Sequence, residues 1–87
     1  MLGSGRQKRM KSLRRLLSEV LRLGEDKIVP ELAIHETATW NSLTHIELVV
    51  TIESAFQVQL SEDEIVAMTS VDKIQKILSE RGVLASE

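Results

Sequence analysis

Cysteine is absent from this 87-residue chain, as is tyrosine, and Trp40, Phe56 and Pro30 are the single tryptophan, phenylalanine and proline. Without cysteine, neither a disulfide framework nor a thiolate metal site can form, so any thiol chemistry would need an added group. With so few aromatic residues, the core must be built from Leu, Ile, Val and Met, which favours helices packed side by side. The sequence therefore predicts a small all-α protein.

A chain of 87 residues is long enough for one small core and too short for a separate catalytic domain. No apolar run approaches the roughly 18 residues that a membrane span requires. The basic stretch from Arg6 to Arg15 is not followed by the uninterrupted apolar core of a signal peptide. We therefore expect a monomer in the cytoplasm, without membrane insertion.

Charge is distributed unevenly along the chain although the net charge is only −2. Residues 1–30 carry eight Lys and Arg against three acidic residues, whereas residues 31–72 carry eight Asp and Glu and neither Lys nor Arg. The basic start suggests nucleic acid or an anionic membrane, but it lacks interleaved aromatics, which favours a solvated helix face. The acidic middle predicts a protein partner with a positive patch and no nucleic-acid partner.

Helical periodicity predicts three main helices and one short helix. The first is predicted from Met10 to Leu23, where apolar residues recur at spacings of three and four and Gly24 follows as a stop signal. The second is predicted from Ser42 to Ala55. The residues expected on its inward face are Leu48, Val49, Ile52 and Phe56.

Capping signals delimit the remaining two helices. Ser61 and Glu64 have the spacing of a capping box, which predicts a short helix from Glu62 to Met68. A last helix is predicted from Val71 to Arg81, and Gly82 ends it. Its expected inward residues are Val71, Ile74, Ile77 and Leu78.

The segments outside these helices complete the predicted organisation. Residues 1–9 are expected to form a flexible lead, in which Gly3-Ser4-Gly5 is typical of an expression tag. Residues 10–82 form the predicted domain and residues 83–87 a tail. Residues 25–39 have no sustained period and are expected to be a long connection, with a short helical turn around Pro30 to Ile34.

Ser42 places a hydroxyl at the end of this long connection and at the start of the second helix. Free backbone N–H groups and the positive end of the helix dipole favour a phosphate at such a position. Position alone favours a simple helix cap, a role for which Asn41 and Ser42 both qualify. Spacing does not decide between the two.

A resemblance to a known family favours a phosphate-bearing Ser42 over a simple helix cap. The Asp-Ser-Leu attachment motif of the acyl carrier protein family, with the helix that follows it, is similar to the segment Trp40-Asn41-Ser42-Leu43-Thr44-His45-Ile46-Glu47-Leu48. The similarity continues through Ile52-Glu53-Ser54-Ala55-Phe56, Val58-Gln59-Leu60-Ser61-Glu62-Asp63-Glu64 and Thr69-Ser70-Val71-Asp72-Lys73-Ile74. A lone three-residue motif would be weak, but the combination is specific.

The resemblance implies a four-helix bundle that performs no catalysis itself. A phosphopantetheinyl transferase would use coenzyme A and Mg²⁺ to attach a 4′-phosphopantetheine arm to Ser42, and the arm's thiol would carry cargo as a thioester. Fatty-acid, polyketide, amino-acid and sugar-modification pathways all use such carriers. The residues expected to dock partner enzymes with basic patches are Asn41, Leu43, Ile46, Glu47, Val50 and Glu53.

The chain departs from the family pattern at Asn41, where the family usually has Asp, so one expected carboxylate is missing from the docking surface. The combination of Trp40 with His45 is more typical of a specialised carrier than of the housekeeping fatty-acid carrier. Trp40 is expected to pack over the helix entrance as a hydrophobic staple.

The sequence offers three alternatives to the carrier. An unmodified helical interaction module is the main alternative. A hydrolase would pair Ser42 with His45 as base and Glu36 as orienting residue, but no Gly-rich elbow surrounds the serine. A metal site at His35 and His45 lacks further ligands, so no metal is expected and His45 is predicted to be a surface residue.

Overall fold

The computed structural model describes the backbone of residues 4–83 and the side chains of residues 13–83. The described chain folds into helices joined by loops, with one isolated β-bridge between Ala33 and Ser70. In chain order the elements are α1 Ser4–Leu21, the 3-10 turn η1 Glu25–Lys27, α2 Ser42–Phe56, α3 Glu62–Ala67 and α4 Val71–Glu80. The predicted all-α bundle of three main helices and a short one is confirmed.

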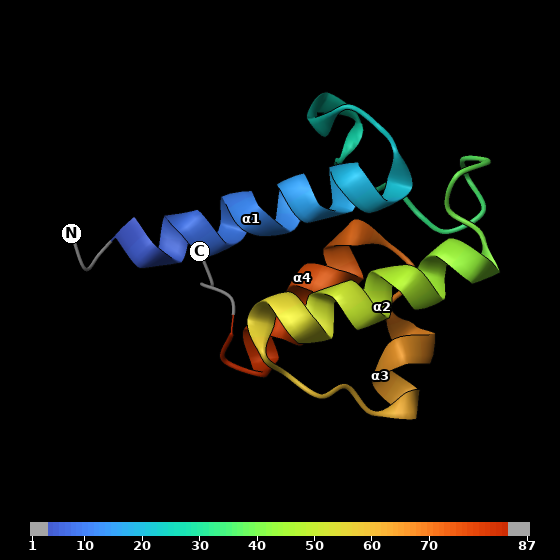
Figure 1. The fold of residues 1–87 in the computed structure, drawn as a ribbon. Coiled ribbons are helices and arrows are strands. Elements are labelled where there is room, and N and C mark those ends of the chain that lie inside the picture. The colour runs from blue at the N-terminus through green and yellow to red at the C-terminus, as the bar shows by residue number, and fades with distance from the viewer. Residues whose placement is uncertain (1–3, 84–87) are drawn as a thin grey trace.

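Figure 1 shows α1 and α2 running in opposite directions, with the long connection joining them at one end of the bundle. Helix α4 lies behind α2, and the short α3 lies against the first half of α2. None of the described helices is long and apolar enough to cross a membrane.

The core lies between α1, α2 and α4, and its buried residues follow the predicted helical stripes. All four expected inward residues of α2 are buried, and so are three of the four in α4, Ile77 being half-buried. Trp40, from the loop before α2, is completely buried at 0% exposure. The buried residues are Leu13, Leu17, Leu21, Ile28, Trp40, His45, Leu48, Val49, Ile52, Phe56, Leu60, Met68, Val71, Ile74 and Leu78.

Helix α1 differs from its predicted bounds at both ends. It begins at Ser4 rather than Met10, because the chain between them contains good helix formers and no proline. It ends at Leu21 rather than Leu23, since Arg22 adopts a left-handed conformation with φ of 58° and the Leu23 N–H bonds to the Ser18 carbonyl at 3.1 Å. Part of the segment expected to be a flexible lead is therefore helical, and residues 1–3 lie outside the described residues.

The long connection contains its helical turn earlier than predicted. The turn occupies Glu25–Lys27, where the Lys27 N–H bonds to the Gly24 carbonyl at 2.9 Å, and not the segment from Pro30 to Ile34. That later segment is tied to the start of α4 instead. The Ile34 N–H donates to Thr69 and the Val71 N–H donates to Leu32, each at 2.9 Å, and within the segment a single turn is closed by the Leu32 N–H and the Val29 carbonyl at 3.0 Å.

The predicted capping signals are present in α3 and α4. Ser61 and Glu64 form a reciprocal capping box, and Ser70 accepts from the Lys73 N–H at the start of α4. Gly82 has φ of 77°, and the Val83 N–H bonds to the Leu78 carbonyl at 3.1 Å, the pattern of a Schellman motif. The predicted ends of α2, α3 and α4 differ from the observed ends by one residue each.

Candidate functional site

Ser42 is the first residue of α2, and Asn41 rather than Ser42 is the cap. The Asn41 Oδ1 accepts from the N–H groups of Leu43 at 2.9 Å and Thr44 at 3.1 Å, and the Thr44 hydroxyl accepts from the Asn41 N–H at 2.9 Å. Ser42 is exposed, and its hydroxyl makes no hydrogen bond within the described residues. The helix start is therefore stabilised without the Ser42 side chain, which leaves its hydroxyl available for chemistry.

The electrostatic setting of Ser42 is simpler than predicted. The expectation of several free N–H groups is wrong, because Asn41 occupies those of Leu43 and Thr44. The helix dipole remains, and the first turn of α2 contains no acidic residue. A phosphate on the Ser42 oxygen would thus meet the positive end of the dipole with no carboxylate in that turn to oppose it.

His45 is buried at 8% exposure, so the prediction of a surface histidine is wrong. Its Nδ1 accepts a hydrogen bond from the Trp40 Nε1–H at 3.1 Å, and its Nε2 lies 3.0 Å from the Ile65 carbonyl oxygen. The ring centroids are 6.2 Å apart and the ring planes differ by 22°. The sequence lacked a signal for this burial because histidine on an otherwise apolar helix face is compatible with either environment.

The hydrolase interpretation is excluded by these contacts. Both ring nitrogens of His45 are bonded to Trp40 and Ile65, so neither is free to accept the Ser42 proton. Glu36, the suggested orienting residue, accepts from the Ala33 N–H at 3.2 Å. Within residues 13–83, no group of three or more potential ligands is placed to hold a metal ion.

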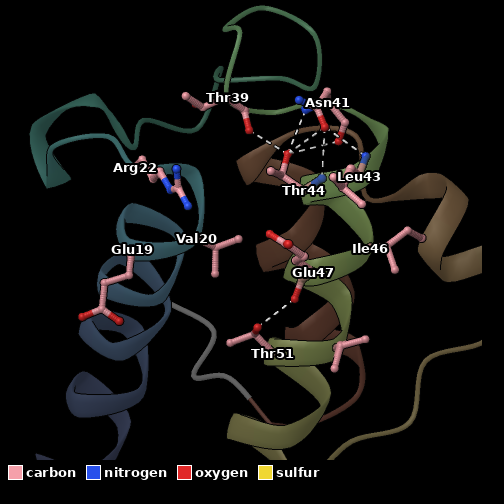
Figure 2. Close-up of a pocket in the computed structure, with 11 residues that line it drawn as sticks. Glu19, Val20, Arg22, Thr39, Asn41, Leu43, Thr44, Ile46, Glu47 and Thr51 are labelled. Carbon is pink, nitrogen blue, oxygen red and sulfur yellow. Dashed lines mark hydrogen bonds between the residues drawn. The ribbon is translucent and has the colours of Figure 1, made fainter.

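A groove of about 750 Å³ runs between the last turn of α1 and the exposed side of α2 (Figure 2). Five of the six residues expected to dock partners line its α2 side, among them Leu43 and Val50, which are 70% and 58% exposed. Figure 2 shows Glu47 pointing into the space between the two helices. The complete lining is Glu19, Val20, Arg22, Thr39, Asn41, Leu43, Thr44, Ile46, Glu47, Val50 and Thr51.

Glu53 is the predicted docking residue that does not line the groove. It is half-buried, and its Oε2 accepts from the Leu60 N–H at 2.9 Å. This bond joins α2 to the segment before α3. Glu47 is exposed and has no side-chain hydrogen bond or ion pair within the described residues, so the two acids have different surroundings.

The α1 wall of the groove was not found from the sequence. It consists of Glu19 and Val20 of α1 and of Arg22 directly after the helix, and the loop residue Thr39 completes the rim. Val20 belongs to the apolar period of α1, but only the antiparallel approach of the helices places it across from α2. Neither the charges nor the helical periodicity of α1 indicated which of its residues would face α2.

Comparison with known protein families bears on the site directly. The family model described as "Phosphopantetheine attachment site" matches residues 11–77, most of the chain, including Ser42 and all residues of α2. No curated protein matches the sequence. The residues present fit the cofactor, since the chain supplies an exposed, unbonded hydroxyl at a helix start free of first-turn acids. The chain therefore belongs to the phosphopantetheine attachment family, which includes the acyl carrier proteins, and its cofactor is covalently attached 4′-phosphopantetheine.

Proposed function

We propose that Ser42 carries the phosphopantetheine arm and that the chain tethers acyl or related intermediates as thioesters and presents them to partner enzymes. The observation that carries this proposal is the Ser42 hydroxyl, which is exposed and unbonded within the described residues while Asn41 caps the helix. A serine that served only as a cap would occupy the Asn41 position. Family membership supplies the nature of the modification.

Attachment is a substitution at phosphorus in which coenzyme A is the donor. The Ser42 oxygen forms a bond to the phosphorus nearer the pantetheine, and the bond from that phosphorus to adenosine 3′,5′-bisphosphate breaks. The serine proton passes to a base of the transferase or to water. The attached arm then supplies the thiol that this cysteine-free chain lacks.

The chain's own residues contribute tethering and docking. A tether raises the effective concentration of cargo at a docked enzyme. Leu43, Ile46 and Val50 expose apolar surface beside the Glu47 carboxylate. This combination suits a partner with apolar side chains and a basic patch. We propose phosphopantetheinyl transferases and acyl-processing enzymes as such partners. We also propose that the reaction takes place in the cytoplasm.

Intact-mass measurement tests the proposal. The full chain is incubated with coenzyme A, Mg²⁺ and a permissive phosphopantetheinyl transferase, and the wild type should gain one phosphopantetheine. Ser42→Ala should gain none, whereas Ser54→Ala, a matched change at an exposed serine of the same helix, should gain mass like the wild type. A gain on Ser42→Ala would overturn the proposal by showing that the arm is attached elsewhere. No gain on the wild type with several transferases would overturn it in favour of the unmodified interaction module.

A further inference from the structure

His45 contacts two segments that flank the proposed attachment residue. Trp40 lies two residues before Ser42, and Ile65 belongs to α3. One imidazole bonds to both, through Nδ1 to the indole and through Nε2 to the carbonyl. The loop that leads into Ser42, the first turns of α2 and the helix α3 are therefore joined at a single side chain.

The hydrogen-bond pattern determines the protonation of this imidazole. An indole N–H can only donate, so the His45 Nδ1 must be the acceptor and must carry no proton. The proton of neutral His45 is then on Nε2, where it is donated to the Ile65 oxygen. In a doubly protonated ring, the Nδ1–H of His45 would face the Nε1–H of Trp40, and neither group can accept a hydrogen bond from the other. Only the neutral ring therefore satisfies both bonds.

Helix α3 depends strongly on such contacts. It has six residues, and none of them is buried. Its other ties across the described chain are the ion pair of Glu64 with Arg81 at 3.2 Å and the partly buried Ile65 side chain, which packs against the core, whereas its capping box is local. Loss of the His45 bond would consequently loosen α3 more than it would loosen α1 or α4, whose buried apolar residues hold them in the core.

No carboxylate compensates for a charge on His45 within residues 13–83, since its two bonds go to an indole and a backbone carbonyl. Glu64 is occupied by Ser61 and Arg81, and Glu36 by the Ala33 N–H. The titratable and charged groups on the elements around it are Glu31, His35 and Glu36 in the loop before α2, Glu47 and Glu53 on α2, Glu62, Asp63 and Glu64 on α3, and Asp72, Lys73, Lys76 and Glu80 on α4.

We propose that His45 is a positioning residue for the modification of Ser42. Its neutral, Nε2-protonated imidazole holds Trp40 and α3 beside the attachment point through its two hydrogen bonds, which we call the latch. Protonation of His45 breaks the bond to Trp40 and so releases the latch. This inference rests on the proposed function of Ser42. A second proton would remove the Nδ1 acceptor that the Trp40 N–H needs, so release is expected at lower pH. Arm attachment should then slow because the surface beside Ser42 is no longer held in one arrangement.

Two spectroscopic measurements test the latch independently of the arm. In the ¹⁵N spectrum of histidine-labelled wild type at pH 8, His45 should show a bare Nδ1 and a protonated Nε2, and the opposite tautomer would overturn the proposal.

Trp40 is the only tryptophan, so its fluorescence emission reports its contact with His45. The emission should change between pH 8 and 5.5 in the wild type and in His35→Gln, but not in His45→Gln. An unchanged wild type, or an equal change in His45→Gln, would contradict the latch.

The link to modification is tested by rates of mass gain. The ratio of the wild-type rate to the His45→Gln rate cancels the transferase's own pH dependence. It should fall about fivefold from pH 8 to 5.5, the factor that corresponds to one hydrogen bond, whereas the ratio for His35→Gln should stay constant. A constant ratio for His45→Gln would refute the positioning role. If the wild type gains no mass at any pH, the proposed function fails, while the tautomer and the emission still decide on the latch.

Discussion

Trp40 donates its indole N–H to Nδ1 of His45 at 3.1 Å, and the planes of the two rings differ by 22°. Because Asn41 is the cap of α2, Trp40 precedes the cap and His45 is the fourth helical residue. These are the positions of a hydrophobic staple, which sets the angle at which a chain enters a helix. The predicted staple is thus present, with a histidine ring as the partner of the indole.

Trp40→Phe is expected to destabilise the fold. Phenylalanine retains an aromatic ring but has no N–H, so the buried His45 Nδ1 loses its donor, which costs about 1–3 kcal/mol. The smaller ring adds a packing loss. Urea denaturation followed by far-UV circular dichroism measures the change, and the emission of Trp40 is not needed.

A double-mutant cycle separates the hydrogen bond from the packing. Trp40→Phe and His45→Leu are measured alone and combined, and a coupling of about 1 kcal/mol is expected if the pair interacts directly. Additive effects of the two changes would show that the bond contributes nothing to stability.

The buried and exposed sides of α2 should respond differently to truncation. Leu48→Ala and Ile52→Ala remove side chains with 0% exposure and should each cost about 2–5 kcal/mol in the free energy of unfolding. Val50→Ala, at 58% exposure, is the control on the same helix and should change it by less than about 0.5 kcal/mol. Thermal or urea unfolding provides the comparison, and similar losses at all three positions would contradict the observed orientation of α2.

Asn41 offers a test of the cap and of the missing carboxylate. Asn41→Ala removes the acceptor for two N–H groups and should cost about 1 kcal/mol. Asn41→Asp keeps that acceptor and adds a charge favoured by the helix dipole, but it loses the bond from Nδ2 to the Ala38 carbonyl. Its stability should stay near the wild type, while arm attachment accelerates because a basic transferase gains a partner charge.

The two variants of Asn41 are compared by melting temperature and by the initial rate of mass gain. A loss of stability in Asn41→Asp as large as in Asn41→Ala would show that the Ala38 bond, and not the cap, stabilises the helix start.

Glu47 and Glu53 should separate docking from stability. Glu47→Lys changes an exposed charge in the groove and should slow arm attachment with little change in melting temperature. Glu53→Ala leaves the Leu60 N–H without its acceptor and should cost about 1.5–3 kcal/mol. Both variants are measured for unfolding and for the rate of mass gain. The assignment fails if Glu47→Lys melts early or if Glu53→Ala is as stable as the wild type.

The sequence by itself determined the helices, their inward stripes, the caps of α3 and α4 and the place of Ser42 at the start of α2. Helical period and capping depend on residues three or four positions apart, so these features are readable locally. The likeness to the carrier family likewise follows from residues along one segment, from about Trp40 to Leu78, and the family model confirms it.

Only the tertiary structure decided what each of these side chains meets. The antiparallel approach of α1 places Arg22 opposite Glu47, and α3 brings the Ile65 carbonyl to a histidine 20 positions earlier in the chain. Glu53 bonds to Leu60 because the chain turns back after α2. Contacts of this kind arise from the packing of segments that are distant in the sequence, and no local pattern specifies that packing. They distinguish Glu53, which has a structural hydrogen bond, from the exposed Glu47, and they show that His45 is buried.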